Sequence, residues 1–530
     1  MTTTRARTTL YRRGRVRTPD DPFATALLVD GDTVAWVGSE AAADSMSAET
    51  TVDLADAWVA PAFVDAHVHA TATGLALTGL DLTGAPSLAV ALDRVAQAAR
   101  AARGGVLLGT GWDDTDWPER RPPTAAELDR ASYGGVVYLA RTDVHSAVAS
   151  SALLAACPQV RMASGWEGDG LVRQQAHHLV RRAAYAAVTP SQRRAAQAAT
   201  LDRAACLGIA CVHECGGPDI GGEQDFTALL ALEHGVEVVG YWGELAETGG
   251  VQRALDLGAV GAAGDLFADG ALGSHTACLA DPYLDEDTSG LAYLTAGQVA
   301  HHVAACTEAG LQAGFHAIGD AALTAVLDGI GLAADAVGAA AVRAARHRVE
   351  HAELLTPVHV AQLARWGVVA SVQPAFDARW GGPDGLYVAR LGAERAATMN
   401  PFAALAAAGV ALALGSDAPV TPLDPWGTVR AAVQHRTPGS GLSARAAFSA
   451  HTRGGWRAAR RDGVGELTPG APASFAVWEL PDELVVQLPD ERVSAWSTDP
   501  RSGVAGLPDL DLPSPVCRST VVGGVPVWHR

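Results

Sequence analysis

The central part of the chain alternates between short runs of small and β-branched residues and longer alanine-rich segments with helical spacing of apolar residues. We interpret eight of the short runs as strands, which end near His69, His213, Trp242, Asp269, His316, His351, Gln373 and Asp417. From the second run onward, neighbouring ends lie between 22 residues (351 to 373) and 47 residues (269 to 316) apart. This spacing suits repeated strand-helix-strand units. The pattern therefore predicts an α/β fold built on a distorted (β/α)8 barrel of the TIM type.

Both ends of the chain show a different pattern, in which short alternating runs are separated by turn residues. The N-terminal runs include ATALLVD and GDTVAWVG, and the Gly-Asp pair at 31–32 suits a hairpin. The C-terminal segments GELTPGAPASFAVWEL, ELVVQL and STVVGGVPVWHR are similar. We expect residues 1–60 and 465–530 to form one composite β-sandwich, and residues 61–71 and 201–464 to form the barrel.

The interval between the first two predicted strand ends is 144 residues, from His69 to His213, which is too long for one crossover. It contains the helical pattern LAVALDRVAQAARAA and the strand-like pieces GGVLLGTG and GGVVYLAR. We therefore predict an inserted α+β domain at residues 72–200, after the first barrel strand, that covers the active site.

Composition and charge narrow the class of function. The chain has 530 residues, of which 48% are hydrophobic, and a net charge of −19, which argues against nucleic acid or anionic membranes as partners. The longest apolar stretch, at 402–415, is too short to span a bilayer, and no apolar signal segment follows the arginines near residue 1. With seven scattered cysteines, we expect a cytoplasmic protein with reduced thiols.

Histidines stand at several predicted strand ends. In FVDAHVH, His67 and His69 share one face of a strand with Asp65, so their imidazoles can bind one cation of the zinc type. The segments FHAIGD, RVEHAEL and GSDAP place His316, His351 and Asp417 at the ends of the fifth, sixth and eighth strands. Barrel enzymes build their sites at this rim, and buried polar side chains need partners. The pattern therefore predicts a shared site of four histidines and one aspartate.

These motifs, in this order, resemble the amidohydrolase superfamily. GWDDTDWPERRPPT, RTDVHSAVASSAL, LFADGALGSHTACL and QPAFDARW are similar to its N-substituted formamide deformylase-like branch, amidohydrolase family 3, over roughly residues 59–470. The resemblance implies a metal-dependent barrel with a composite β-sandwich and an insertion after the first strand. It also implies a set of metal ligands, made up of His67, His69, His316, His351 and Asp417. Of these, Asp417 would handle the proton of the attacking water, and we expect Asp417 and His351 to be catalytic.

The chain departs from the family pattern at the position of a bridging ligand. Many superfamily members bridge two metals with a carboxylated lysine on the fourth strand, but all 39 basic residues here are arginine. Where many relatives have that lysine, this chain has Asp265, and where some have a glutamate in the insertion it has Gln174. Three arrangements stay open: a single cation, two cations bridged by Asp265, or a further ligand from Cys215 or Glu214. We favour a divalent metal, zinc, with one ion rather than two.

Other residues are predicted to contact a substrate or to support the site. His145, Asp269, His275, Arg379 and Trp112 are the predicted substrate-binding residues, and Asp269 with Gly270 is also expected to shape the fourth rim loop. Trp117 and Trp380 could extend an apolar wall. Glu350 alternates away from His351, so we expect it to pair structurally.

The predicted function is metal-dependent hydrolysis of a carbon–nitrogen bond, of amide or formamide type and not a peptide bond, by a metal-activated water. One alternative is deamination of an aminated ring, and an alternative of another class is a non-catalytic metal-binding scaffold. The expected partner is a small-molecule substrate, with no nucleic acid and no membrane, and the oligomeric state, a homodimer included, stays open.

Overall fold

The computed structural model describes residues 8–102, 104–114, 117–141, 146–487, 496–497 and 505–530. The chain divides into two compact units, one made of Met1–His69 with Leu201–Arg530 and the other of Ala70–Thr200. Each unit has its own sheets and its own hydrophobic clusters.

A sheet of eight parallel strands forms the centre of the first unit. Its strands, in sheet order, are β7 (Phe63–Val68), β13 (Ile209–Gly216), β14 (Glu237–Trp242), β15 (Gly261–Ala262), β16 (Gln312–Ala317), β17 (Arg348–His351), β18 (Val369–Val372) and β19 (Ala411–Leu414). A parallel bridge between Val68 and Ala418 joins the two edges, and the backbone N–H of Asp417 donates to the His67 carbonyl at 2.8 Å. The sheet is therefore a nearly closed barrel, which confirms the predicted fold class.

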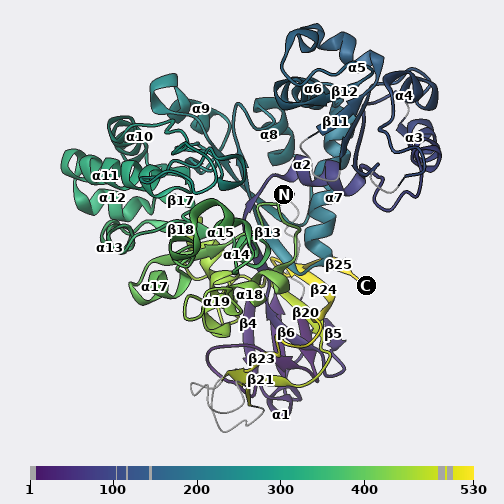
Figure 1. The fold of residues 1–530 in the computed structure, drawn as a ribbon. Helices are drawn as coiled ribbons and strands as arrows, with labels where there is room; N and C mark the ends of the chain where they lie inside the picture. The colour runs from purple at the N-terminus through teal and green to yellow at the C-terminus, as the bar shows by residue number, and fades with distance from the viewer. Residues whose placement is uncertain (1–7, 103, 115–116, 142–145, 488–495, 498–504) are drawn as a thin grey trace. The chain divides into compact units, whose positions relative to one another are not determined.

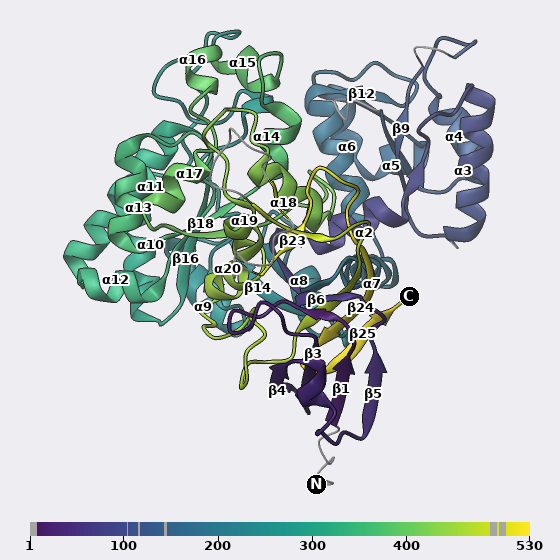
Figure 2. The same cartoon turned by 90° about the horizontal axis from the view of Figure 1, so that it is seen from below.

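Helices surround the strands of this barrel (Figures 1 and 2). They are α8 (Glu223–Leu230), α9 (Gly250–Asp256), α10 (Ala296–Glu308), α11 (Asp320–Val337), α12 (Ala339–Ala345), α13 (Pro357–Trp366), α14 (Pro374–Trp380), α15 (Leu386–Leu391), α16 (Ala393–Ala396), α17 (Phe402–Ala407), α18 (Pro425–Val433), α19 (Ala444–Ala450) and α20 (Arg453–Ala458). Helix α10 begins at a capping box, in which Thr295 and Gln298 satisfy each other's backbone N–H groups. Helix α11 buries Leu323, Leu327 and Ile330, which recur at helical spacing on one face.

The fourth strand differs from the prediction. Strand β15 is only two residues long and ends at Ala262, not near Asp269. Gly264 follows with φ +87°, a left-handed conformation that favours glycine, and a β-carbon there would lie 3.1 Å from Cys215. The chain thus leaves the sheet early, and Asp265 stands at the rim in place of Asp269.

Strands from both chain ends form the remaining layers of the first unit. One sheet contains β4 (Thr33–Gly38), β3 (Ala26–Asp30), β1 (Thr8–Arg12) and β5 (Thr50–Asp53), and short helix α1 (Glu40–Ala43) follows β4. The other sheet contains β2 (Arg15–Val16), β6 (Trp58–Pro61), β20 (Phe475–Glu479), β24 (Val516–Val522) and β25 (Val525–His529). A small third sheet contains β21 (Leu484–Gln487), β22 (Trp496–Ser497) and β23 (Leu507–Pro508). Tyr11 and Phe475 meet edge to face at 5.1 Å in the core between the first two sheets.

The second unit is an α+β structure around a mixed five-stranded sheet. The strands, in sheet order, are β12 (Leu171–Arg173), β11 (Ser146–Ala149), β10 (Val137–Arg141), β9 (Leu107–Trp112) and β8 (Leu80–Asp81). Its helices are α2 (Ala70–Thr78), α3 (Leu88–Ala102), α4 (Ala125–Ala131), α5 (Ser151–Ala156), α6 (Gln174–Ala186) and the first part of α7 (Pro190–Cys206). Trp112 and Trp117 lie with Leu128 and Leu139 in one of its hydrophobic clusters.

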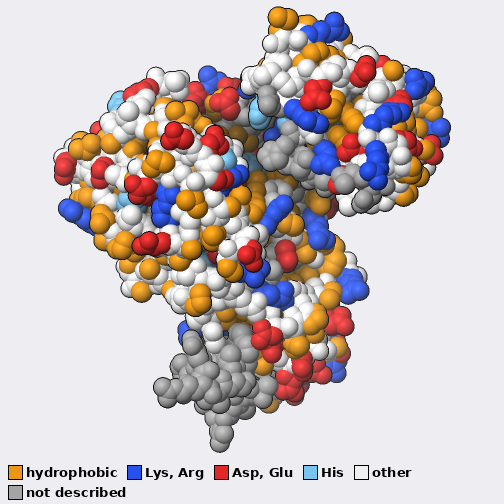
Figure 3. Space-filling model, in the orientation of Figure 1, with side chains coloured by type: hydrophobic (Ala, Val, Ile, Leu, Met, Phe, Trp, Pro, Cys, Tyr) orange, Lys and Arg blue, Asp and Glu red, His pale blue; other side chains and the backbone are white. Residues whose placement is uncertain are grey.

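The surface of the described residues is mixed in charge. On the face that Figure 3 shows, acidic and basic side chains alternate and the basic ones do not gather into one continuous patch. Among the helices that the structure describes, none combines the length and the apolar character needed to cross a membrane. All seven cysteines lie in the described part of the chain and are free thiols.

Candidate metal centre

Six side chains meet at the carboxyl-terminal rim of the barrel. His67 lies on β7 and His69 follows that strand, while His316 and His351 lie on β16 and β17. Asp265 and Asp417 follow β15 and β19. The Nε2 atom of His69 lies 3.1 Å from Asp265 Oδ2 and 3.2 Å from Asp417 Oδ1. The Nε2 atom of His67 lies 3.5 Å from the same Asp417 oxygen. The structure thus brings together the five residues of the predicted ligand set and Asp265, which the sequence offered as a further ligand.

Asp265 lies between histidines that come from different strands. Its Oδ1 atom is 3.4 Å from His67 Nε2, 3.6 Å from His316 Nδ1 and 3.6 Å from His351 Nε2. Its Oδ2 atom faces His69. One carboxylate is therefore within reach of all four imidazoles.

Several atoms at this point are buried polar atoms that have no hydrogen-bond partner among the described residues. They are His67 Nε2, His316 Nδ1, His351 Nε2, Asp265 Oδ1 and Asp417 Oδ1. Buried polar groups without partners are costly, and native proteins nearly always satisfy them. Two atoms bound at about 2.0–2.1 Å to one tetrahedral cation lie about 3.3 Å apart, close to the 3.4–3.6 Å measured around Asp265 Oδ1. Nitrogen and carboxylate donors at this spacing fit a divalent cation of the zinc type.

Oxygen atoms behind three of the imidazoles set which ring nitrogen faces the cluster. His67 Nδ1 lies 3.0 Å from Glu350 Oε2, His351 Nδ1 lies 2.8 Å from Gln373 Oε1, and His316 Nε2 lies 3.1 Å from the Gly270 carbonyl. These oxygens can only accept, so each outer nitrogen carries the proton. The inner nitrogens of the three rings then present lone pairs to the same space, as metal-binding histidines do.

Electrostatics at the rim favour positive charge. Burial lowers the pKa of His69, but the carboxylates of Asp265 and Asp417 beside its Nε2 atom outweigh burial and raise that pKa to about 10. Burial raises the pKa of Asp265, yet the neighbouring imidazoles hold it well below its usual value. The two aspartates are therefore ionised at neutral pH. Their negative charge attracts either protons onto the imidazoles or a metal cation in place of those protons.

Glu350 and Arg348 form a buried layer beneath His67. Arg348 donates to both carboxylate oxygens of Glu350, at 2.8 and 3.0 Å, and to His213 Nδ1 at 2.9 Å. Glu350 and Arg348 are fully buried, and Arg348 holds the pKa of Glu350 below its usual value against the opposing effect of burial. The sequence-based expectation gave Glu350 a structural pairing role, but it named neither Arg348 nor His67 as a partner.

Cys215 lies on the same interior side of β13 as His213. Its sulfur, His67 and Glu350 can place one ligand atom each within 4.8 Å of the others. Burial raises the pKa of the Cys215 thiol to about 12, so it is protonated at neutral pH. Glu214, between His213 and Cys215, is buried and faces away from the interior by strand alternation.

Backbone strain marks two of the rim residues. His351 has φ 69° and Asp417 has φ 53°, and both values are uncommon for residues with a β-carbon. Asp65, which we expected on the face of His67 and His69, accepts from the backbone N–H of Ser416 at 2.9 Å. This bond ties the first strand to the segment that carries Asp417.

The predicted substrate-binding residues of the first unit differ in their surroundings. The Asp269 carboxylate is fully buried and accepts from the backbone N–H groups of Cys278, Ile318 and Gly319 at 2.8–3.0 Å. It therefore orders the rim loop, as expected, but has no surface for a substrate. His275 is held by Asp285 and Glu286, at 3.1 and 2.9 Å. Arg379 is exposed and donates to the Val420 carbonyl at 2.9 Å.

Trp112 is buried within the second unit. Only 1% of it is exposed, and its indole N–H donates to the Leu139 carbonyl at 2.9 Å. The expectation that Trp112 contacts substrate is thus replaced by a packing role, because no ring surface is exposed. Trp117 is buried in the same cluster, with 2% exposed. His145 and the side chain of Gln174 lie outside what the structure describes.

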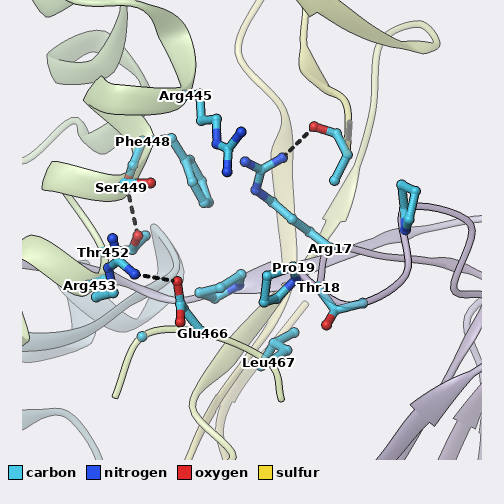
Figure 4. Close-up of a pocket in the computed structure, with 14 residues that line it drawn as sticks. Arg17, Thr18, Pro19, Arg445, Phe448, Ser449, Thr452, Arg453, Glu466 and Leu467 are labelled. Carbon is cyan, nitrogen blue, oxygen red and sulfur yellow. Dashed lines mark hydrogen bonds and ion pairs between the residues drawn. The ribbon is translucent and has the colours of Figure 1, made fainter. Parts of the chain in front are cut away.

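A separate pocket lies near the opposite end of strand β7, where Pro61 precedes the strand. Figure 4 shows the side chains of Arg17 and Arg445 turned toward one another there, with Phe448 beside them. Arg453 pairs with Glu466 at 2.8 Å. None of the residues that line this pocket belongs to the rim cluster.

Comparison with known proteins assigns the family. The model of the amidohydrolase family matches residues 50–528, which is most of the chain. The chain belongs to the amidohydrolase family. A putative amidohydrolase, YtcJ of Bacillus subtilis, is 29% identical over 426 residues, covering 73% of this chain and 75% of YtcJ.

Two further relatives support this assignment. The LONG AFTER FAR-RED 3 protein of Arabidopsis thaliana is 29% identical over 514 residues, covering 88% of this chain and 86% of that protein. The crystal structure of an uncharacterized metal-dependent hydrolase from Pyrococcus furiosus has a TM-score of 0.75 and 26% sequence identity, and the match covers 89% of this chain and 98% of that structure. The family match thus extends over the barrel, the second unit and the C-terminal strands.

Proposed function

We propose that this amidohydrolase hydrolyses a carbon–nitrogen bond, of amide or formamide type and not a peptide bond, in a small molecule. The observation that carries the proposal is the set of three inward-facing imidazole nitrogens and two carboxylate oxygens, all buried without hydrogen-bond partners in the described part of the chain. The protein of similar fold from Pyrococcus furiosus is described as a metal-dependent hydrolase, which supports the metal-dependent and hydrolytic parts of the proposal.

The residues that would hold the cation are His67, His69, His316, His351, Asp265 and Asp417. When bound, a divalent cation of the zinc type lowers the pKa of water to about 7 and polarises a carbonyl group. The metal is expected to be zinc, with other divalent ions as outcomes of metal analysis.

Asp417 is the residue that we propose to move the proton. It starts as a carboxylate, because His67 and His69 lower its pKa more than burial raises it. Its side chain is 9% exposed and that of His69 is 14% exposed, so a small molecule can approach from the rim. Asp417 would accept the proton of the attacking water and deliver it to the leaving nitrogen as the bond breaks.

Aromatic residues beside the cluster favour an apolar substituent on the substrate. The ring of Phe376 is stacked on His351 at 6.0 Å and contacts Trp380 at 4.6 Å. Phe267 contacts the ring of His316 at 4.9 Å and is 36% exposed. Phe376 is itself buried, so the exposed part of Phe267 and the half-buried Trp380 would supply the surface, which suits an aromatic or aliphatic group more than a charged one.

The test is release of an amine from a panel of small N-substituted formamides and acetamides by purified, zinc-loaded protein. We expect turnover of at least one aromatic member, loss of turnover after chelation and at least a hundred-fold loss in Asp417→Asn. His301→Gln, which changes an exposed histidine on α10, is the matched control and should keep full activity. Full activity in Asp417→Asn would reject the proposed proton transfer. Ammonia release from aminated rings, without amide turnover, would reject the amide assignment.

A further inference from the structure

We propose that the pocket shown in Figure 4 binds a phosphate-type oxyanion between Arg17 and Arg445. The pocket shares no lining residue with the rim cluster, so this inference is independent of the proposed function. Its volume is about 140 Å³. A single water molecule needs about 10–15 Å³ on the same kind of measure, so the pocket has room for a small ion.

The first argument is the balance of charge in the pocket. Among the described residues that line it, the charged ones are Arg17, Arg445, Arg453 and Glu466. Glu466 already pairs with Arg453 at 2.8 Å. The guanidinium groups of Arg17 and Arg445 are thus left without a carboxylate partner in the part of the chain that the structure describes. They lie together in a chain whose net charge is −19, and an anion between them would relieve their repulsion.

The second argument is that the fold holds the Arg17 side chain in place. The backbone N–H of Arg17 donates to the Val59 carbonyl at 2.8 Å. Its Nη1 atom donates to the carbonyls of Ala505 and Gly506 at 2.8 and 2.9 Å, and its guanidinium lies 5.1 Å from the centre of the Phe448 ring. The Nε and Nη2 atoms have no hydrogen-bond partner among the described residues. Arg17 therefore presents ordered, unused donors to the pocket.

The third argument is electrostatic. Burial lowers the pKa of Arg17, and the positive charge of Arg445 lowers it further, to about 10. Both effects oppose the charge on Arg17, and neutral hydrogen bonds to backbone carbonyls do not cancel that charge. Arg445, on α19, is exposed, so its side chain can move to meet a ligand.

The chemistry of the two arginines selects the class of anion. Each guanidinium is a planar fork that can donate two parallel N–H bonds to a pair of oxygen atoms. A carboxylate has one such pair and a single negative charge, which one arginine satisfies. A phosphate group has enough oxygen atoms for both forks, and its charge at pH 7 is about −1.5 to −2. A phosphate-type dianion therefore matches this site better than a carboxylate.

The test is calorimetric titration of inorganic phosphate into the full-length protein at fixed ionic strength. We expect saturable binding by the wild type, and binding at least about ten-fold weaker in Arg445→Gln. Arg445→Lys keeps the charge but loses the fork, so its affinity should lie between the two. Arg365→Gln, at an exposed position on α13, is the matched control and should bind as the wild type does. Metal-free protein should also bind phosphate, because the rim is not involved.

Titrations with acetate and phenyl phosphate define the ligand. Acetate should bind more weakly than phosphate, and equal affinity would overturn the assignment to a dianion. Binding of phenyl phosphate would support a phosphate ester as the occupant, whereas its exclusion beside binding of inorganic phosphate would support the free ion.

Two results would overturn the site itself. One is the absence of saturable phosphate binding by the wild type, which decides the matter even if Arg445→Gln does not fold. The other is phosphate affinity in folded Arg445→Gln within about two-fold of the wild-type value.

Discussion

Replacing Glu350 with glutamine tests the link between the buried ion pair and the rim. Glu350 accepts from Arg348 at 2.8 and 3.0 Å, and from His67 at 3.0 Å. In Glu350→Gln the Arg348 charge loses its counterion while it stays buried, which costs about 3–5 kcal/mol of unfolding free energy. The amide N–H₂ group can also face His67 Nδ1, which then accepts and shifts the ring proton to Nε2.

A proton on Nε2 competes with metal binding, and the uncompensated Arg348 charge repels the cation. Loss of such a supporting contact lowers metal affinity by about 10- to 100-fold, or about 1.4–2.7 kcal/mol. Zinc affinity would be measured by competition with a chromogenic chelator, and stability of the metal-free protein by urea unfolding. Glu223→Gln is the control, because its partner Arg253 is exposed and such pairs contribute at most about 1 kcal/mol.

The reasoning is refuted if Glu350→Gln binds zinc within about two-fold of the wild-type affinity while it remains folded. Such a result would mean that Glu350 does not set the ring proton of His67. A loss of stability with unchanged metal affinity would mean that Glu350 has only the structural pairing role that the sequence suggested and does not affect metal binding.

Three further predictions concern pH, metal and substrate. Burial lowers the pKa of His302 to about 4, so its neutral form stabilises the fold above pH 6.5 and this contribution declines as pH falls toward 4. Between pH 6.5 and pH 4, urea unfolding of the metal-free protein should show that the wild type loses about 3 kcal/mol more of its unfolding free energy than His302→Gln does. The same pH dependence in both proteins would contradict this. Zinc at a hundred times its dissociation constant should stabilise the wild type by about 2.7 kcal/mol, and equal stability with and without chelator would argue against a metal centre. Phe267→Leu should lower kcat/KM for aromatic substrates by about 3- to 10-fold with unchanged metal content, because Phe267 is the partly exposed ring beside His316. An equal loss for aliphatic substrates would show that stacking is not the cause.

The architecture could be predicted because the hydrophobic periodicity, and the spacing between predicted strand ends, follow directly from repeated strand-helix units. Seven of the eight predicted strand ends lie within about three residues of the observed ends. The exception is β15, where the run VGAAGDLFAD is rich in glycine and alanine and has no periodic signal for its boundary. Its early end follows from tertiary packing against Cys215 and Tyr241, which a local pattern does not contain.

The rim cluster could be predicted in part. Several histidines at the ends of different strands are not explained by packing, because buried polar side chains need partners. Asp265 was singled out because it replaces a family lysine, but its reach depends on the turn at Gly264. Glu350 and Gln373 were not recognised as partners of the histidines, because their contacts join different strands. Alternation along RVEH could have indicated that Arg348 and Glu350 share one face.

Anomalous scattering from crystals of the zinc-loaded protein tests the central claim most directly. The account predicts anomalous density at the barrel rim, with ligand atoms drawn from His67, His69, His316, His351, Asp265 and Asp417 at about 2.0–2.2 Å. A zinc-loaded crystal with no anomalous peak among these side chains would contradict it.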